Sequence, residues 1–384
     1  MCIVIGRFFV GSVPMFEVAL QCQVPTVLYG PNGIGKTSRV GALARLLNRE
    51  LIRIPLLGLE PPDLTGLPLL KGDHVEFVPP KMISQLKENP DRYILLLDEI
   101  NRIPPDKVQA LICQLLDREH GVFNIPNNML VVGTCNITDL GIFKPSKMLR
   151  SRMAWFECKP DSNLYLKFLQ DGEFDNQFHI VPPDWPKHIQ WARNLMYIFL
   201  STHRSLILKD PEEDSDAAEM EFPYRTQRGF DMTINIWAGL RALGISNVQN
   251  LEKALASTCG ISTAATFRDF LSKIELPDTE KFINEYLLEG IEYDTKKYNL
   301  DAFLYLMMSE VYYYMLEKAA SDISYARRIW KASMDYLESY IKKEKAKEVS
   351  IMLVRLFVKA DSQSNLRIAG QIPPSILQLI KKVV

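Results

Sequence analysis

The chain has 384 residues, of which 47% are hydrophobic and 24% are charged, and its formal net charge is −1. These values are typical of an ordinary globular protein that is long enough for two or three domains. Binding to nucleic-acid phosphates requires a basic surface, so we do not expect nucleic acid as a partner. No uncharged stretch approaches the roughly 18 residues of a membrane-spanning helix, so no membrane segment is expected either.

The six cysteines lie at positions 2, 22, 113, 135, 158 and 259. None are paired at the two-residue spacing that zinc sites favour, and the chain is not small and disulfide-dense. We therefore expect reduced thiols and a cytoplasmic location. The opening residues, MCIVIGRFFVGSVP, are apolar but interrupted by Arg7 and two glycines, and they lack the ordered regions of a signal peptide. An edge strand or a core-packing arm is predicted there.

Residues 30–37 read GPNGIGKT and lie between an apolar run at 24–29 and an amphipathic stretch at 38–47. This is the G-x-x-x-x-G-K-[ST] pattern in the strand–loop–helix context that it requires. Glycines let such a loop wrap around phosphates, which then face backbone N–H groups and the helix N-terminus. Lys36 would reach the β- and γ-phosphates, and the Thr37 hydroxyl would bind Mg²⁺. The predicted nucleotide-binding loop comprises Gly30, Pro31, Asn32, Gly33, Ile34, Gly35, Lys36, Thr37 and Ser38.

The segment at 58–80, GLEPPDLTGLPLLKGDHVEFVPP, contains two short apolar runs on either side of Lys71-Gly72-Asp73. A glycine-containing turn between two such runs is typical of a β-hairpin, and we predict a small hairpin here. A loose connection is the alternative.

Residues 92–100 read RYILLLDEI, and the apolar run at 93–97 predicts a strand that is buried on both faces. Asp98 follows this strand and is placed to hold Mg²⁺ through its water shell. Glu99 is placed to orient and deprotonate a water molecule that attacks the γ-phosphate. The pair therefore predicts hydrolysis rather than binding alone. In the alternative interpretation, both carboxylates cap the next turn.

Strands are predicted near 24–29, 51–56, 93–97, 129–135 and 153–157, with helices near 36–48, 80–88 and 105–118. This alternation is typical of an α/β fold with a mainly parallel sheet between two layers of helices. Ligands of such sheets bind beyond the carboxyl ends of the strands, where both motifs lie.

After residue 158 the chain is predicted to be helical, with an aromatic helix at 185–202 and an acidic run at 210–221 that we interpret as a solvated loop. Apolar residues such as Phe303, Met307, Val311 and Met315 recur at helical spacing. The three tyrosines at 312–314 are predicted to be core or interface residues.

The segment at 98–121, DEINRIPPDKVQALICQLLDREHG, resembles the MoxR-like branch of the AAA+ ATPases. The DLTG at 63–66 and its hairpin resemble the helix-2 insertion of the same group, and the resemblance extends from about residue 24 to residue 277. It implies a P-loop NTPase fold with a five-stranded parallel sheet, an α-helical lid and a C-terminal helical region. We accordingly expect an AAA+ core at 1–158, a connecting segment with the lid at 159–280, and the C-terminal region at 281–384.

The resemblance also implies roles for polar residues outside the two motifs. Asn136 ends the segment VVGTCN, where the family carries its sensor-1 residue; a simple strand-end turn residue is the alternative. Arg152 matches the family's arginine finger, which would reach the neighbouring subunit's site with Arg150 assisting. In a monomer both would be surface charges. Arg225 matches sensor 2, with Arg228 as the alternative, because Gln227 replaces the family's usual tryptophan.

Taken with the motifs, the resemblance implies a homo-oligomeric ring, expected to be a hexamer, which binds ATP and Mg²⁺ and hydrolyses ATP to remodel a partner protein in the manner of a chaperone. A protein with a von Willebrand factor A domain is the candidate partner. Two other functions stay open: a nucleic-acid translocase like the McrB-type proteins, and a nucleotide-dependent switch or defence component.

Overall fold

The computed structural model describes residues 15–103, 107–117, 126, 128–137, 143–171, 178–208, 222–274, 276–294, 299–343, 347–358, 360 and 368. The chain divides into two compact units, one of residues 1–189 with 205–265 and one of residues 190–204 with 266–384. The opening residues and the acidic run at 210–221, for which predictions are given above, lie outside the described residues. The division into a core at 1–158, a lid segment at 159–280 and a C-terminal region at 281–384 stays a prediction.

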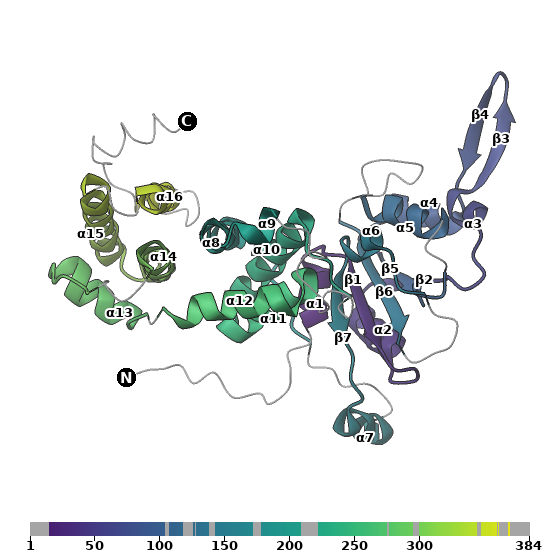
Figure 1. The fold of residues 1–384 in the computed structure, drawn as a ribbon, viewed down its shortest axis with the longest axis horizontal. Helices are drawn as coiled ribbons and strands as arrows, with labels where there is room; N and C mark the ends of the chain where they lie inside the picture. The colour runs from purple at the N-terminus through teal and green to yellow at the C-terminus, as the bar shows by residue number, and fades with distance from the viewer. Residues whose placement is uncertain are drawn as a thin grey trace. The chain divides into compact units, whose positions relative to one another are not determined.

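The first unit is built on a five-stranded parallel sheet with the strand order β2-β5-β6-β1-β7 (Figure 1). The predicted α/β fold and its five strands are thereby confirmed. The strands are β1 (Thr26–Gly30), β2 (Glu50–Pro55), β5 (Tyr93–Asp98), β6 (Leu130–Asn136) and β7 (Ala154–Glu157). The helices around them are α1 (Met15–Gln21), α2 (Lys36–Leu46), α3 (Pro61–Thr65), α4 (Lys81–Glu88), α5 (Lys107–Asp117), α6 (Lys147–Arg150) and α7 (Ser162–Asp171).

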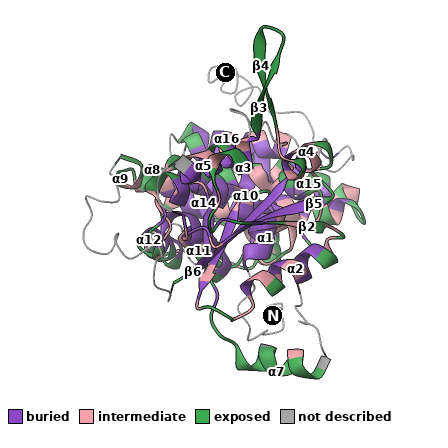
Figure 2. Ribbon diagram, turned by 90° about the vertical axis from the view of Figure 1, so that its right-hand side faces the viewer, coloured by how far each residue is buried: buried purple, intermediate pink, exposed green. Residues whose placement is uncertain are grey.

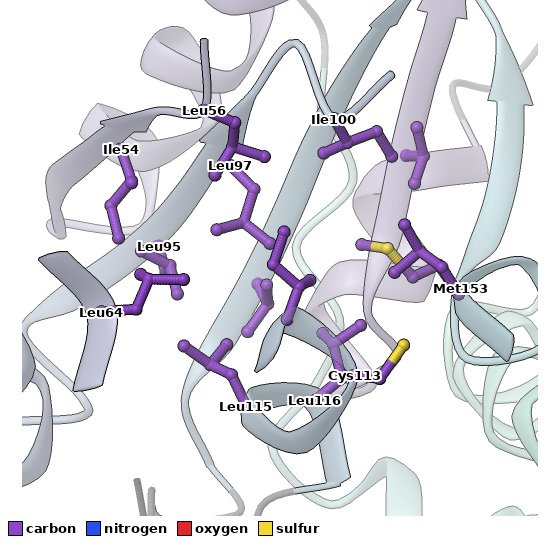
Figure 3. Packing of buried hydrophobic residues seen from close by; sticks show 14 of the residues in the cluster. Ile54, Leu56, Leu64, Leu95, Leu97, Ile100, Cys113, Leu115, Leu116 and Met153 are labelled. Carbon is purple, nitrogen blue, oxygen red and sulfur yellow. The ribbon is translucent and has the colours of Figure 1, made fainter. Parts of the chain in front are cut away.

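Hydrophobic side chains cover both faces of the sheet, as the apolar run of β5 predicts. Leu95 and Leu97 belong to a core cluster that also contains residues of α3, α4 and α5 (Figure 3). Ile94 and Leu96 point to the other face, where the cluster contains residues of α1 and α2. Successive side chains of a strand alternate between faces, so a strand buried on both sides must be apolar throughout. Polar chemistry is therefore expected at the carboxyl ends of the strands.

The predicted hairpin is confirmed as β3 (Leu67–Lys71) paired antiparallel with β4 (His74–Val78). Every residue of both strands is exposed (Figure 2). Helix α7 is also largely exposed, and its large apolar side chains at Tyr165, Leu166 and Leu169 are among those that face solvent. A two-stranded hairpin alone is at best marginally stable in water. The hairpin and α7 therefore both expose apolar side chains that the core of the first unit does not cover.

The remainder of the first unit is helical: η1 (Trp185–His188), α9 (Ser205–Leu208), α10 (Gln227–Ala242) and α11 (Val248–Cys259). Helix α10 begins after Thr226, whose hydroxyl accepts a hydrogen bond from the amide of Gly229 at 3.2 Å and caps the first turn. It packs along α11, and the Trp237 indole donates to the Leu251 carbonyl at 2.9 Å. This helical pair occupies the region where the sequence predicts a lid.

The second unit is helical, as predicted. Its elements are α8 (Ile189–Thr202) and α12 (Ile261–Ser272), both of which start in the first unit, then α13 (Thr279–Lys281), the π-helix η3 (Phe282–Leu288), α14 (Leu300–Ala319), α15 (Ile323–Lys342) and α16 (Lys347–Val358). The predicted apolar stripe of α14 is buried, and so is Tyr312, whereas Tyr313 and Tyr314 are half-buried. Among the described helices, none is both long and apolar enough to cross a bilayer.

Candidate nucleotide-binding site

The phosphate loop turns sharply between β1 and α2, and two glycines make the turn feasible. A Cβ atom at Gly30 would lie 2.2 Å from the carbonyl oxygen of Cys158, so a side chain does not fit there. Gly35 has a φ of 85°, a left-handed conformation that glycine adopts without the usual steric penalty, and α2 starts at the next residue. The Lys36 ammonium is buried and donates to the carbonyls of Gly30 at 2.9 Å and Pro31 at 2.7 Å.

Lys36 also lies near the carboxyl end of β6. Burial raises the pKa of the Cys135 thiol to about 12, and the positive charge of Lys36 acts in the opposite direction. Cys135 immediately precedes Asn136, the last residue of β6. Strands β1 and β6 are neighbours, with Gly30 opposite Asn136. The loop lysine and the predicted sensor-1 residue therefore meet at the same edge of the sheet.

Asp98 ends β5 and both of its carboxylate oxygens accept hydrogen bonds from the protein. The Arg53 guanidinium donates from Nε to Oδ2 at 2.8 Å and also from Nη2, and the Thr134 hydroxyl donates to Oδ1. The Asp98 side chain is only 8% exposed. Hydrogen bonds of this kind hold a buried carboxylate in one orientation.

Glu99 adopts a left-handed backbone conformation with a φ of 57°. This conformation costs a residue with a side chain about 1 kcal/mol, and such strain persists where surrounding contacts fix it. The amide of Glu99 donates to the Thr134 hydroxyl oxygen at 2.9 Å, and the amide of Ile100 donates to the Thr134 carbonyl at 2.9 Å. Thr134 thus holds both members of the acidic pair, with its hydroxyl as a donor to Asp98 and an acceptor from Glu99.

Asn136 contacts Glu99 directly, because its Nδ2 donates to Glu99 Oε1 at 2.8 Å. The main chain of Asn136 is in turn held by Asn101, whose Nδ2 donates to the Asn136 carbonyl and whose Oδ1 accepts from the Asn136 amide at 3.3 Å. Arg102 lies on the other side of the carboxylate, with Nε 3.7 Å from Glu99 Oε2. The structure therefore brings together the predicted base and the predicted sensor-1 amide.

Arg152 follows α6 and binds Asp117, the last residue of α5. Its Nε donates to Oδ1 at 2.9 Å and its Nη2 to Oδ2 at 2.7 Å, while Nη1 donates to the carbonyl of Met148 at 2.9 Å. Partial burial alone would lower the pKa of Arg152, but the hydrogen bonds and charge of Asp117 raise it above the ordinary value. Arg228 joins the same carboxylate, with Nη1 3.1 Å from Oδ1. The predicted finger and the alternative sensor-2 residue thus share one acidic partner.

Arg150 and Arg225, the other two predicted arginines, are both buried. Arg150 lies over the ring of Tyr224 at 5.3 Å from its centroid, an arrangement that favours a cation. Nearby, the ring of Phe222 stacks on that of Trp155 in β7 at 5.0 Å. Arg225 therefore lies just before α10, directly after a segment that packs beside the sheet.

The site offers oxygen ligands that suit Mg²⁺. Asp98 and Thr37 offer hard oxygen ligands, and Asp98 lies on the face of the sheet that α2 covers, because it follows the alternation of Ile94 and Leu96. Mg²⁺ is commonly held by one or two protein groups together with phosphate oxygens and water. Among the described residues no three metal-binding side chains gather, and a phosphate-borne ion does not require such a cluster.

Sequence reasoning missed four residues that hold the site: Arg53, Asn101, Asp117 and Thr134. Two of them left a signal, since Arg53 is a lone charge inside the apolar stretch LIRIPL and Thr134 is a lone hydroxyl inside VVGTC. Neither residue type in its local sequence predicts which residue it will contact, because the partner, Asp98, lies on another strand.

The parallel sheet order, the phosphate loop after β1 and the acidic pair after β5 define a P-loop NTPase with the AAA+ fold. Residues 26–159 match the family described as "ATPase family associated with various cellular activities (AAA)", so the chain carries an AAA ATPase domain.

Similar proteins include Lon proteases. The human mitochondrial Lon protease homolog is 34% identical over 128 residues, which are 29% of this chain and 13% of that protein. The Lon protease of Campylobacter jejuni is 32% identical over 148 residues, which are 35% of this chain and 18% of that protein. The chain thus spans less than a fifth of the length of these relatives. A crystal structure of a candidate ATPase from Cytophaga hutchinsonii has a TM-score of 0.46 and 17% identity, and the match covers 64% of this chain and 80% of that chain.

Proposed function

We propose that this chain hydrolyses ATP with Mg²⁺ and works in a homo-oligomeric ring, expected to be a hexamer, as a MoxR-like chaperone that remodels a partner protein. The observation that carries the proposal is the contact between Asn136 Nδ2 and Glu99 Oε1 at the edge of the sheet where the Lys36 loop lies. A nucleotide-binding loop alone would support binding. A fixed carboxylate beside it supports hydrolysis.

Each side chain has a defined task in the proposed reaction. The ammonium of Lys36 attracts the β- and γ-phosphates, and Thr37 and Asp98 would hold Mg²⁺, which neutralises charge on the phosphate oxygens when bound. Glu99 accepts a proton from the attacking water. Asn136 fixes the Glu99 carboxylate from one side, and Thr134 fixes its backbone. The base is thus oriented before the nucleotide arrives, as electrostatic preorganisation requires.

The ring is proposed because a second subunit would complete the site with an arginine. Arg152 is the better candidate for this role, since it is half-buried whereas Arg150 is buried. To act on a neighbouring subunit, Arg152 must leave Asp117, and the planar guanidinium could then pair with phosphate oxygens in the same bidentate way. Arg225 would act on the nucleotide of its own subunit.

The hairpin is the part of the first unit that we assign to the partner protein. Pro68, Leu70, Val75 and Phe77 share one face of the hairpin, because Pro68 lies opposite Phe77 and Leu70 opposite Val75. These side chains are solvent-exposed, with Leu70 at 78% exposure. An exposed apolar face of this kind suits transient binding of a protein. A protein with a von Willebrand factor A domain is the candidate, from the resemblance to MoxR-like proteins.

The test compares phosphate release from ATP by the wild type, by Glu99→Gln and by Glu157→Gln. Glu157 ends β7 at the same edge of the sheet, pairs with Lys159 and has no task in the proposed reaction, so it is a matched control. We expect Glu99→Gln to abolish phosphate release and Glu157→Gln to retain it. Equal rates in all three proteins would contradict the proposal. Affinity capture with Glu99→Gln in ATP would then identify the partner that stays bound.

A further inference from the structure

Arg53 and Asp98 form an ion pair at the place where the metal is expected. Arg53 donates to Asp98 Oδ2 through two guanidinium nitrogens, and Thr134 donates to Oδ1. Both oxygens of this carboxylate are therefore occupied by donors of the protein. A positive charge already lies against the group that would receive Mg²⁺.

The pair lies on the face of the sheet that carries the phosphate-loop helix. Strand β2 runs beside β5, with Arg53 opposite Leu96 and Pro55 opposite Asp98. Leu96 packs with residues of α2, whereas Ile54, the next residue after Arg53, packs into the cluster on the opposite face. Because side chains alternate along a strand, Arg53 and Asp98 share the face of Leu96. The guanidinium thus lies on the same side as Lys36 and Thr37, the first residues of α2.

The two partners differ in how freely they can move. The Arg53 side chain is 58% exposed, and the Asp98 side chain is 8% exposed. An exposed arginine loses little free energy when it leaves such a pair, because water replaces its hydrogen bonds. The carboxylate, by contrast, stays fixed by Thr134. The arginine is therefore the mobile partner.

We propose that Arg53 is a counter-ion of Asp98 that competes with Mg²⁺, so that the ion and its nucleotide must displace the guanidinium when they bind. This inference rests on the proposed function, since it assumes that the site takes Mg²⁺ with ATP. Arg53 is a positioning residue in this account. It keeps the carboxylate in place before nucleotide binds, and it raises the Mg²⁺ concentration that the site needs.

The test measures Mg²⁺ dependence of nucleotide binding rather than turnover. Glu99→Gln protein binds a fluorescent ATP analogue while Mg²⁺ is titrated, and the half-saturating Mg²⁺ concentration is compared with that of Glu99→Gln carrying Arg53→Ala. Breaking an ion pair that has one exposed partner corresponds to a change of up to about fivefold in a binding equilibrium. We expect Arg53→Ala to lower the half-saturating concentration by about that factor, and Arg53→Lys to give an intermediate value.

Arg92→Ala is the matched control. Arg92 binds Glu50 Oε1 through the same two nitrogens, Nε at 3.1 Å and Nη2 at 2.6 Å, at the opposite end of the strands, since Glu50 starts β2 and Arg92 precedes β5. Its side chain is 60% exposed, close to the value for Arg53. This variant should leave the half-saturating Mg²⁺ concentration unchanged, and an equal decrease in both variants would show that general charge, not the Asp98 pair, is responsible.

Two other outcomes would overturn the inference in distinguishable ways. An unchanged or higher half-saturating Mg²⁺ concentration in folded Arg53→Ala would contradict the competition and leave the proposed function intact. A Glu99→Gln parent that binds no nucleotide at any Mg²⁺ concentration would contradict the proposed function together with the inference. Circular dichroism of each variant establishes that it is folded.

Discussion

Replacing Thr134 by valine should separate hydrolysis from nucleotide binding. The side chain of Thr134 is buried, and valine has nearly the same shape, so packing should be preserved. Valine cannot donate to Asp98 Oδ1 or accept from the amide of Glu99, which are the two hydrogen bonds of the threonine hydroxyl. The substitution therefore removes the group that holds the Asp98 carboxylate and the main chain of Glu99, and it leaves the phosphate loop untouched.

The expected size of the effect follows from these contacts. A buried polar group left without a hydrogen bond costs about 1–3 kcal/mol, and here the amide of Glu99 and one oxygen of Asp98 each lose a partner. We expect the free energy of unfolding to fall by about 2–4 kcal/mol. The left-handed conformation of Glu99 also loses a restraint, and a displaced base can lower kcat by about a hundredfold. Affinity for ATP should change little, because Lys36 keeps its place.

Thr26→Val provides the control for this experiment. Thr26 is a fully buried threonine of β1 whose hydroxyl oxygen has no hydrogen-bond partner among the described residues. Valine there should leave the unfolding free energy unchanged or raise it, and hydrolysis should be normal. Urea denaturation, single-turnover hydrolysis and equilibrium binding of ATP are measured for both variants. A Thr134→Val protein that hydrolyses ATP at the wild-type rate would refute the idea that this hydroxyl orients the base.

Three further predictions concern other parts of the first unit. Arg152→Ala and Glu99→Gln proteins, each inactive alone, should recover some ATPase activity when mixed, and no recovery despite proven subunit exchange would exclude a role in trans. Replacing residues 69–77 by a Gly-Ser link should spare basal ATPase activity but abolish stimulation by a partner; loss of basal activity in intact rings would contradict this. Burial raises the pKa of Glu17 to about 7, so its native form holds a proton that the unfolded chain releases. The unfolding free energy should therefore fall as the pH rises from about 4.5 to about 7. Glu17→Gln should remove up to about 3 kcal/mol of that fall in urea titrations, whereas an unchanged pH profile would refute it.

The strands, the hairpin and the positions of the acidic pair could be predicted because each depends on local sequence. Apolar runs identify buried strands, and the Lys71-Gly72-Asp73 turn identifies the hairpin. Glu99 is predicted at the end of a strand for the same reason. Its left-handed backbone could not be predicted, because glutamate disfavours that conformation and a contact with Thr134, distant in the sequence, stabilises it.

The partners of the site residues could not be predicted, because they depend on strand order. Strand β5 lies between β2 and β6, which brings Arg53 from one side and Thr134 from the other to the same carboxylate. A single sequence does not reveal this order. The ion pair between Arg152 and Asp117 could not be predicted either. Asp117 ends α5, and Arg152 lies in a turn about 35 residues later in the chain. The roles of Asn136, Arg152 and Arg225 stay predictions.

Equilibrium binding of ATP to Lys36→Ala and to Glu99→Gln, measured with phosphate release in the same samples, tests the central claim most directly. We predict that neither variant releases phosphate, but for different reasons. Lys36→Ala should bind ATP weakly because it lacks the charge that holds the phosphates, and Glu99→Gln should bind ATP with near wild-type affinity because only the base is lost. Equal loss of ATP binding in both variants, or phosphate release by Glu99→Gln at the wild-type rate, would contradict the assignment of Glu99 as the catalytic base.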